Sequence, residues 1–168
     1  MLPKLFITDI DGVWTNGGMY YTADGDVMKR FSVKDGWGVA FLRHLEIPLA
    51  IFTGENSPVV AQRAKKLGIE KCYLGVKDKL ELAKKVCEEM NISLQEVAFI
   101  GDDINDLPLL TAVGFSGCPK DSPFYIEGKV NFPGKKRGGD GAFREFVEAI
   151  LLREGMLLKV VDQCAARH

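Results

Sequence analysis

The sequence has few of the side chains on which several enzyme classes depend. Its two histidines are His44 and His168, which gives a serine–histidine hydrolase little to work with. Its four cysteines are widely spaced and form no Cys-x-x-Cys pair. That spacing is typical of small buried residues in a reducing compartment, and not of a disulfide framework or a zinc site. No apolar run approaches the length of about 18 residues that indicates a membrane span.

Neither sign of charge is in excess, because 22 basic and 23 acidic residues give a formal net charge of -1. This balance argues against a broad nucleic-acid-binding surface, which requires clustered positive charge. The acidic residues Asp9 and Asp11 come too early in the chain for the apolar segment of a secretory signal. We therefore expect a soluble, cytoplasmic protein that binds neither nucleic acid nor a membrane.

Two glycine-rich loops of nucleotide-binding enzymes are also missing. Gly36-Trp37-Gly38 does not continue to a third glycine at the dinucleotide-binding spacing. No Gly-x-x-x-x-Gly-Lys-Ser/Thr loop occurs anywhere in the sequence. These absences argue against a dinucleotide-dependent enzyme and against a P-loop kinase.

What the sequence does contain is an alternation of apolar runs and helical patterns. The runs end at turns and predict strands buried on both faces at residues 5–7, 49–52, 72–75, 97–100 and 114–117. Helices are predicted from Ser57-Pro58 to Gly68, from Asp78 to Met90, and around 143–151. The alternation predicts an α/β fold in one domain covering 1–168. We expect a Rossmann-like doubly wound parallel sheet with helices on both faces.

One segment, at about residues 16–31, interrupts this alternation. Runs of β-prone residues flank Asp24-Gly25, a dipeptide that predicts a hairpin. Because the hairpin directly follows the first strand, we expect it to form a flap over a site at that strand end. Only this hairpin and one helix fit between Asp11 and Thr53, so no cap domain is expected. The tail at about 155–168 is partly apolar, and the sequence does not place it.

Polar side chains follow the predicted strands. The set consists of Asp9, Asp11, Thr53, Lys79, Asp102, Asp103 and Asp106. The carboxyl ends of parallel strands line the ligand crevice of such a sheet, so these side chains are expected to converge. Several carboxylates in one crevice would repel one another. We therefore expect Mg²⁺, which prefers oxygen ligands and often binds together with a substrate phosphate.

The order of these residues carries a family resemblance. Asp9-Ile10-Asp11-Gly12-Val13, Thr53-Gly54, Lys79 and Gly101-Asp102-Asp103-x-x-Asp106 resemble the successive motifs of the haloacid dehalogenase superfamily of phosphatases. The segment 9–15, the Gly-Gly-Met-Tyr-Tyr hairpin and the loop at 135–145 extend the resemblance to the small phosphatases of 3-deoxy-sugar acids. Members of that group are capless, magnesium-dependent tetramers. The resemblance implies a homotetramer here too, with neighbouring subunits closing the site.

The resemblance also implies catalytic roles. Asp9 resembles the nucleophile that forms an aspartyl-phosphate. Asp11 resembles the acid that protonates the leaving sugar oxygen and then the base that activates water. Asp9, the main-chain carbonyl of Asp11, and Asp102 would bind Mg²⁺. Thr53 and Lys79 would hold the phosphoryl group.

The remaining site residues have competing interpretations. Asp103 and Asp106 are expected behind the metal ligands, hydrogen-bonded to them or to the loop, although Asp106 could instead cap the following helix. Arg63 and Lys66 could be exposed helix charges, and Glu55 could cap a turn. The substrate-binding set comprises Thr53, Gly54, Glu55, Arg63, Lys66, Lys79 and Arg137, with Arg144 as a further candidate.

The substrate expectation depends on Glu55. The resembled group hydrolyses 3-deoxy-D-manno-octulosonate 8-phosphate (KDO 8-phosphate), and its members usually have Arg at this position. Members that act on 2-keto-3-deoxynononate 9-phosphate (KDN 9-phosphate) resemble this chain in having Glu there, with a Lys at the position of Lys66. We therefore expect the nine-carbon substrate, with KDO 8-phosphate as the alternative. A third hypothesis is a non-catalytic assembly domain, like those fused to some acylneuraminate cytidylyltransferases.

Overall fold

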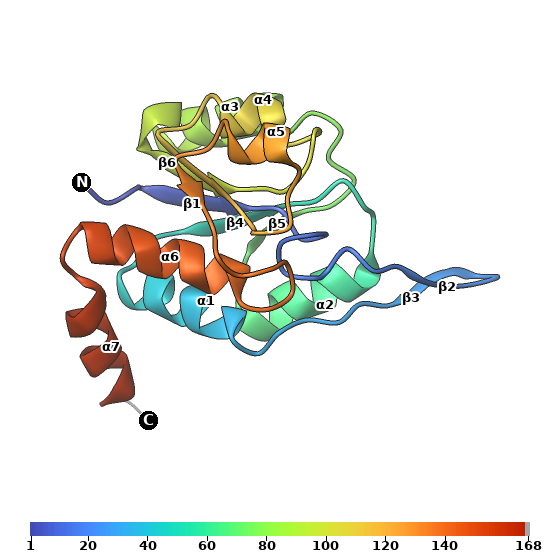
Figure 1. Cartoon of the computed structure of the whole chain (residues 1–168), viewed down its shortest axis with the longest axis horizontal. Coiled ribbons are helices and arrows are strands. Elements are labelled where there is room, and N and C mark those ends of the chain that lie inside the picture. Colours follow the sequence, from blue (N-terminus) through green and yellow to red (C-terminus); the bar gives the residue numbers. More distant parts are fainter. Residues whose placement is uncertain (167–168) are drawn as a thin grey trace.

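The protein is described here by a computed structural model covering residues 1–166, without the side chains of residues 26 and 27. His168 therefore lies outside the described residues. The main sheet is six-stranded with the order β5-β4-β1-β6-β7-β8, and all its pairings are parallel (Figure 1). Its strands are β1 (Leu5–Thr8), β4 (Leu49–Phe52), β5 (Lys71–Tyr73), β6 (Val97–Ile100), β7 (Phe115–Cys118) and β8 (Phe132–Pro133).

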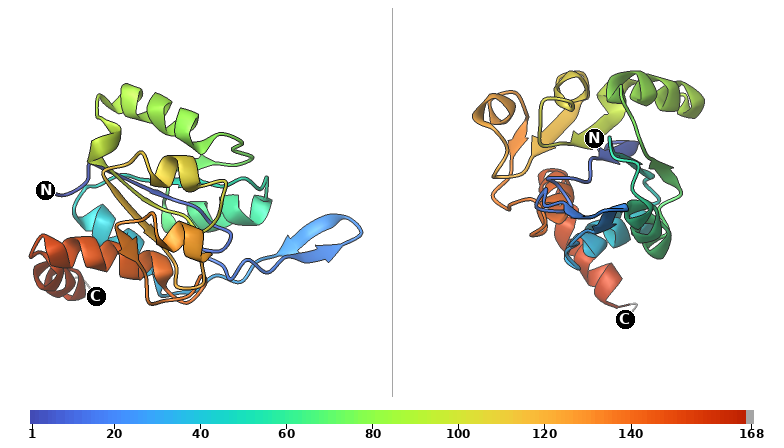
Figure 2. Two further views of the ribbon diagram at one scale, coloured as in Figure 1. Left: turned by 45° about the horizontal axis from the view of Figure 1, so that its top comes forward. Right: turned by 90° about the vertical axis from the view of Figure 1, so that its right-hand side faces the viewer.

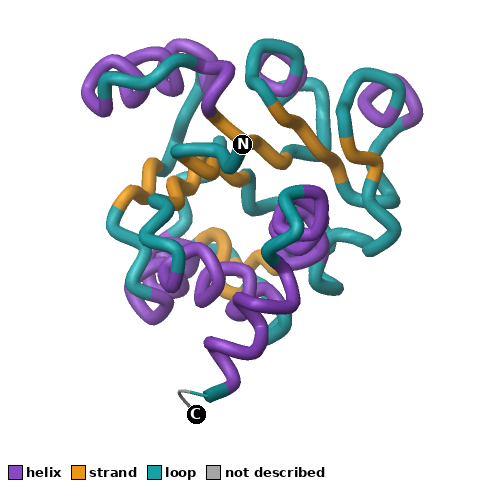
Figure 3. Tube along the Cα trace, turned by 90° about the vertical axis from the view of Figure 1, so that its left-hand side faces the viewer, coloured by secondary structure: helices purple, strands orange, loops and turns teal. Residues whose placement is uncertain are grey.

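Helices cover both faces of this sheet, as predicted. The helices are α1 (Asp35–His44), α2 (Pro58–Leu67), α3 (Lys79–Met90), the 3-10 turn η1 (Leu94–Glu96), α4 (Leu107–Leu110), α5 (Phe124–Glu127), α6 (Ala142–Arg153) and α7 (Leu157–Ala165). Figure 3 shows the strands as a layer between two groups of helices. The core residues of α1, α2 and α6 belong to one face, and those of α3, α4 and α5 to the other.

Successive side chains along each strand point to opposite faces of the sheet, so each strand contributes to two separate cores. Phe6 and Ile51 face the cluster under α1 and α6, whereas their neighbours Ile7 and Phe52 face the cluster under α3. All four residues of β1 and of β4 are buried. Continuous apolar runs are thus explained by burial on both faces, which confirms the parallel α/β prediction.

The predicted helix boundaries are confirmed where capping residues define them. Helix α2 begins at Pro58 and ends before Gly68, whose φ of 65° closes the helix. Helix α3 begins after Asp78, whose Oδ1 accepts a hydrogen bond of 2.9 Å from the backbone N–H of Glu81. This cap fixes the start of the helix at Lys79, a predicted site residue.

The hairpin forms, but it does not cover the sheet of its own chain. Strands β2 (Tyr20–Thr22) and β3 (Gly25–Met28) pair antiparallel and project from the body as an arm (Figures 1 and 2). All three residues of β2 are exposed. The hairpin is confirmed, and its role as a flap stays a prediction; its base, which carries Gly17 and Lys29, reaches the site.

Four elements were not predicted from the sequence, namely η1, α5, β8 and α7. Strand β8 has two residues, which is too short for a recognisable pattern. Helix α7 occupies most of the tail and packs on α1, where His44 Nε2 lies 2.9 Å from Gln163 Oε1. No helix within residues 1–166 combines the length and apolar character needed to span a membrane.

Candidate active site

A polar cavity of about 300 Å³ lies at the carboxyl ends of the central strands. Strand β1 lies between β4 and β6, so the residues that follow these three strands are brought together. The lining consists of Asp9, Asp11, Gly12, Gly17, Thr53, Gly54, Glu55, Asp102, Asp103 and Asn105. The sequence-predicted residues after the first, second and fourth strands thus converge in one cavity.

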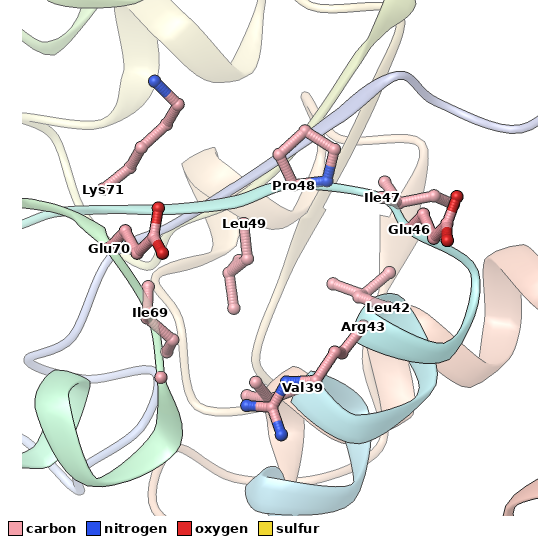
Figure 4. A pocket seen from close by; sticks show the side chains of 11 residues that line it. Val39, Leu42, Arg43, Glu46, Ile47, Pro48, Leu49, Ile69, Glu70 and Lys71 are labelled. Atoms are coloured by element: carbon pink, nitrogen blue, oxygen red, sulfur yellow. The ribbon is translucent and has the colours of Figure 1, made fainter.

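A larger cavity of about 410 Å³ lies near the opposite ends of the strands (Figure 4). Leu49 and Lys71, the first residues of β4 and β5, line it together with apolar residues of α1. Its charged residues, Arg43, Glu46, Glu70 and Lys71, are of mixed sign. It has no cluster of carboxylates and no residue of the predicted motifs, so the smaller polar cavity is the candidate active site.

Backbone and side-chain hydrogen bonds fix the position of Asp9. Its N–H donates to the carbonyl of Ile100 over 3.0 Å, which ties the end of β1 to β6. Thr8 Oγ1 donates to the Asp9 carbonyl over 2.7 Å, and Trp14 Nε1 donates to Thr8 Oγ1 over 2.9 Å. The Trp14 ring stacks on Phe143, with ring centroids 4.7 Å apart. The carboxylate of Asp9 therefore projects from a rigid backbone.

Lys79 is a buried ammonium held between two aspartates. Its Nζ lies 2.9 Å from Asp9 Oδ1 and 2.5 Å from Asp106 Oδ1, and its side chain is only 2 % exposed. Burial alone would lower the pKa of Lys79, but the attraction of Asp9 and Asp106 outweighs it and leaves that pKa raised. The lysine therefore stays charged; it lies behind Asp9 and is not among the residues that line the cavity.

Asp106 acts through its side chain and not as a helix cap. Its Oδ1 accepts from Lys79, and its Oδ2 accepts from the backbone N–H of Asp102 over 2.9 Å. The side chain makes no capping hydrogen bond to α4, so the capping alternative is wrong. Asp103 is exposed, and its Oδ1 accepts from the N–H of Ile104 over 2.7 Å. Both aspartates thus lie where hydrogen bonds to the loop were expected.

The carboxylates of Asp9, Asp102 and Asp106 form a cluster that fits a divalent cation. One oxygen of each lies within 4.8 Å of the others. Burial, followed by repulsion from Asp106, raises the pKa of Asp9 to about 7. Burial, followed by repulsion from Asp9, raises the pKa of Asp102 to about 8. Such mutual repulsion is relieved by a hard cation that prefers oxygen ligands. Because both oxygens of Asp106 already accept hydrogen bonds, Asp9 and Asp102 are better placed to bind it.

Gly12 allows the two catalytic loops to approach each other. Its φ is +85°, and a Cβ at this position would lie 1.9 Å from Asp102 Oδ2. Glycine is therefore required for the Asp102 carboxylate to reach the loop that carries Asp9 and Asp11.

Asp11 is paired with a residue that the sequence did not single out. Lys29 Nζ lies 2.7 Å from Asp11 Oδ1, and Thr15 Oγ1 lies 3.5 Å from the same oxygen. Lys29 follows β3 at the base of the hairpin arm. A basic residue in a hairpin strand is ordinarily a solvent-exposed residue, so the sequence offered no signal that this one is buried.

Thr53 is fully buried at the end of β4 and lines the cavity with Gly54 and Glu55. The backbone carbonyl of Thr53 accepts from Val76 over 2.9 Å, which anchors the turn. The Glu55 side chain is exposed at the cavity, and its carbonyl accepts from the N–H of Gly75. Glu55 is thus placed to meet a ligand in the cavity, as a substrate-binding residue must.

The other expected sugar contacts do not line the cavity. Arg63 Nη2 donates to the carbonyl of Ser32 over 3.2 Å, and its guanidinium lies over the Phe31 ring. Lys66 is exposed on α2, and no hydrogen bond or ion pair joins it to Glu55 among the described residues. Arg137 is exposed in the loop 134–141. These side chains would need a ligand or another subunit to complete any role in binding.

The loop 134–141 nevertheless packs against the catalytic loop. The N–H of Gly139 donates to the carbonyl of Val13 over 3.0 Å. A Cβ at Gly138 would lie 2.0 Å from the carbonyl oxygen of Gly12, so glycine is needed for this approach. The loop therefore supports the turn that holds Asp11.

Helix α6, which follows this loop, is anchored by a buried carboxylate. Asp35 Oδ1 accepts from the backbone N–H of Arg144 over 3.1 Å. Burial raises the pKa of Asp35 to about 6. The Arg144 guanidinium pairs with Glu148 over 2.6 Å and lies over the Phe41 ring. Arg144 is thus engaged within its own chain, away from the cavity.

The fold and the cavity together define a class. Carboxylates after β1 and β6, a buried threonine after β4 and a buried lysine at the start of α3 are the arrangement that the haloacid dehalogenase resemblance implied. A family model described as haloacid dehalogenase-like hydrolase matches residues 32–114, which include Thr53, Lys79 and Asp102.

Comparisons with individual proteins narrow this class to a family. The KDO 8-phosphate phosphatase KdsC of Haemophilus influenzae is 37% identical over 152 residues, covering 90% of this chain and 84% of the relative. KdsC of Escherichia coli K12 is 34% identical over 154 residues, covering 92% and 82% of the two chains. The chain therefore belongs to the KDO 8-phosphate phosphatase family of haloacid dehalogenase-like hydrolases, and it is a phosphatase.

Solved structures agree with this assignment. A Moraxella catarrhalis KDO 8-phosphate phosphatase, in complex with a magnesium ion, a phosphate ion and a KDO molecule, has a TM-score of 0.91 and 34% identity. The match covers 96% of this chain and 92% of that one. The cobalt-bound Haemophilus influenzae phosphatase has a TM-score of 0.88 and 36% identity, with 92% and 91% covered.

Proposed function

We propose that the chain hydrolyses the phosphate monoester of a 3-deoxy-2-keto sugar acid in a Mg²⁺-dependent reaction. The observation that carries this proposal is the buried Lys79 between Asp9 and Asp106, beside the Asp102 carboxylate. This arrangement offers a nucleophile, a fixed cation for phosphoryl oxygens and carboxylates for a metal. The Moraxella relative with magnesium, phosphate and KDO supports the same assignment.

In the first step the Asp9 carboxylate attacks phosphorus, and the bond from phosphorus to the sugar oxygen breaks. Asp11 gives its proton to that leaving oxygen. Lys79 has three N–H donors, of which Asp9 and Asp106 take two, so a phosphoryl oxygen can take the third. The hydroxyl of Thr53 binds a second phosphoryl oxygen.

In the second step water attacks the phosphorus of the aspartyl-phosphate, and Asp11 accepts a proton from that water. Inorganic phosphate leaves and the Asp9 carboxylate is restored. Asp9, Asp102 and the main-chain carbonyl of Asp11 would hold Mg²⁺, with Asp106 and Asp103 hydrogen-bonded behind them. When bound, the ion offsets the charge of these carboxylates and of the phosphoryl oxygens.

Turnover of a generic phosphate ester with and without Mg²⁺ tests the reaction. The Asp9→Asn variant should lose hydrolysis, whereas Asp162→Asn, which alters an exposed carboxylate on α7, should retain most of it. Full activity of Asp9→Asn would refute the nucleophile assignment. Failure of the wild-type chain to turn over any ester would favour the non-catalytic assembly hypothesis.

For the sugar, we propose KDO 8-phosphate. The named relatives, at 34–37% identity, favour this eight-carbon alternative over the nine-carbon substrate expected from Glu55. KDN 9-phosphate stays a second candidate because Glu55 lines the cavity with an exposed side chain. An arginine at this position would bind the carboxylate of the substrate, whereas a glutamate can accept hydrogen bonds from its sugar hydroxyls.

Measuring kcat/KM for both sugar-acid phosphates decides between these substrates. We expect the wild-type chain to prefer KDO 8-phosphate. A wild-type preference for KDN 9-phosphate that Glu55→Arg reverses would overturn this choice and establish Glu55 as the specificity residue. Glu46→Arg, which adds the same charge away from the polar cavity, is the matched control.

We also infer that the chain assembles as a homotetramer whose neighbouring subunits complete the site. The projecting arm and its exposed Tyr20 and Tyr21 support this inference, because such an arm gains contacts only from another molecule. Light scattering on the eluting protein should give four times the chain mass. A monomer with full activity toward the sugar-acid phosphate would contradict the inference.

A further inference from the structure

Lys29 is a buried cation at the base of the hairpin arm. Its side chain has no exposed surface, and its Nζ lies 2.7 Å from Asp11 Oδ1, whose side chain is 21% exposed. The same Nζ lies 3.3 Å from Met19 Sδ, at the other side of the arm's base. Lys29, which lies outside the catalytic loop in the sequence, is thus held against the Asp11 carboxylate.

Anchoring the arm does not by itself require a charge here. Removing an ammonium and a carboxylate from water costs several kcal/mol per ion, and well-packed apolar residues often stabilise a fold equally well. An ammonium in this position does something that an apolar side chain cannot do, because it donates a directed hydrogen bond to one chosen oxygen of Asp11.

The two oxygens of Asp11 have different surroundings. Oδ1 faces Lys29 Nζ at 2.7 Å and Thr15 Oγ1 at 3.5 Å. Oδ2 is buried and has no hydrogen-bond partner within the described part of the chain. Lys29 therefore fixes the rotation of the Asp11 carboxylate by holding one of its two oxygens.

We propose that Lys29 is a positioning residue that fixes the Asp11 carboxylate for proton transfer to the leaving oxygen. This inference rests on the proposed function, in which Asp11 is the general acid. The proton moves from the Asp11 carboxyl group to the sugar oxygen as the bond from phosphorus to that oxygen breaks. Lys29 keeps its own protons throughout and acts only by holding Oδ1.

The dependence of the rate on the leaving group separates this role from a purely structural one. A sugar alkoxide must be protonated as it leaves, whereas p-nitrophenolate is stable as an anion and needs no acid. The ratio kcat/KM reports the steps up to the first irreversible one, here transfer of the phosphoryl group to Asp9. It is therefore the quantity to compare for the two kinds of ester.

The experiment compares wild type, Lys29→Met, Lys29→Gln and Lys29→Arg in Mg²⁺ with two substrates. One is p-nitrophenyl phosphate, and the other is whichever of KDO 8-phosphate and KDN 9-phosphate the wild type hydrolyses faster. Lys29→Met should lower kcat/KM about 100-fold for the sugar ester but only about threefold for p-nitrophenyl phosphate, since general acid catalysis contributes on the order of 10²–10⁴-fold. Lys29→Arg, which keeps a charged donor, should recover part of the loss. Lys159→Met, an exposed lysine on α7, is the matched control and should match wild type.

Equal losses on the two esters would overturn the inference and leave Lys29 a structural residue. Thermal unfolding of each variant, followed by circular dichroism, checks folding. If Lys29→Met does not fold, the losses of kcat/KM on the two esters are compared for Lys29→Gln and Lys29→Arg instead. Failure of all three variants to fold would also assign Lys29 a purely structural role. A wild type inactive on both esters would instead refute the proposed function itself.

Discussion

Magnesium binding to this site should release protons and should therefore depend steeply on pH. Without metal, the pKa of Asp9 is about 7 and that of Asp102 about 8, so both carboxyl groups hold protons in slightly acidic solution. A metal ion needs both in the ionised form. At about pH 6, ionising the two costs about 4 kcal/mol, and at about pH 8 the cost falls below about 1 kcal/mol. The apparent affinity for Mg²⁺ should therefore rise several-hundred-fold, on the order of 10²–10³, between these pH values.

Isothermal titration calorimetry tests this directly. Titrating Mg²⁺ at about pH 6 in two buffers of different ionisation enthalpy counts the protons released, and we expect about two per ion. Asp102→Asn should lower this count by about one and weaken binding, whereas Asp162→Asn, which alters an exposed carboxylate on α7, should change neither. An affinity that is flat between about pH 6 and about pH 8, with no proton release, would refute the assignment of Asp9 and Asp102 as ligands.

Further predictions concern the groups that hold the site in place. Lys79→Met should abolish measurable phosphatase turnover and lower the free energy of unfolding by about 3–5 kcal/mol, because it leaves buried carboxylates unpaired; the exposed Lys84→Met is the control. For Asp35, the fold raises the pKa from 3.8 to about 6, so the folded state binds more protons over that range. The free energy of unfolding in denaturant should then fall by about 2 kcal/mol from about pH 4 to about pH 6 in Mg²⁺, and Asp35→Asn should remove this dependence. Gly138→Ala should reduce both Tm and kcat/KM, because its Cβ would meet the catalytic loop, whereas Gly128→Ala, with ordinary contacts, should change neither.

The ends of the strands could be predicted because burial in a parallel sheet produces a recognisable sequence pattern. Burial on both faces forces continuous apolar runs, and each run stops where a polar side chain such as Asp9, Thr53 or Asp102 enters the cavity. Helix starts were predictable where a local hydrogen bond defines them, as Asp78 does for α3. These signals depend on residues close together in the sequence, which is why one chain was enough to reveal them.

The features that could not be predicted depend on contacts between residues that are distant in the sequence. Lys29 meets Asp11 across 18 positions, and Asp35 meets Arg144 across 109. No local pattern distinguishes either from an ordinary surface charge. The direction of the hairpin arm could not be predicted either, because pairing of β2 with β3 determines the hairpin but not its angle to the body. The sugar specificity is likewise undetermined by periodicity, because it depends on one exposed side chain, Glu55.

The charge balance of the site explains why a metal is needed for binding as well as for chemistry. When Asp9, Asp102 and Asp106 are all ionised, Lys79 offsets only one of their negative charges. Lys29 does not correct the imbalance, since its contact is with Asp11. A phosphate monoester dianion would add further negative charge to a cavity that already repels it. Burial, together with the repulsion between carboxylates, raises the pKa of Asp9 to about 7 and that of Asp102 to about 8, so protons compete with a cation for these groups. Bound Mg²⁺ would take the place of those protons and would offset the charge that repels a substrate phosphate.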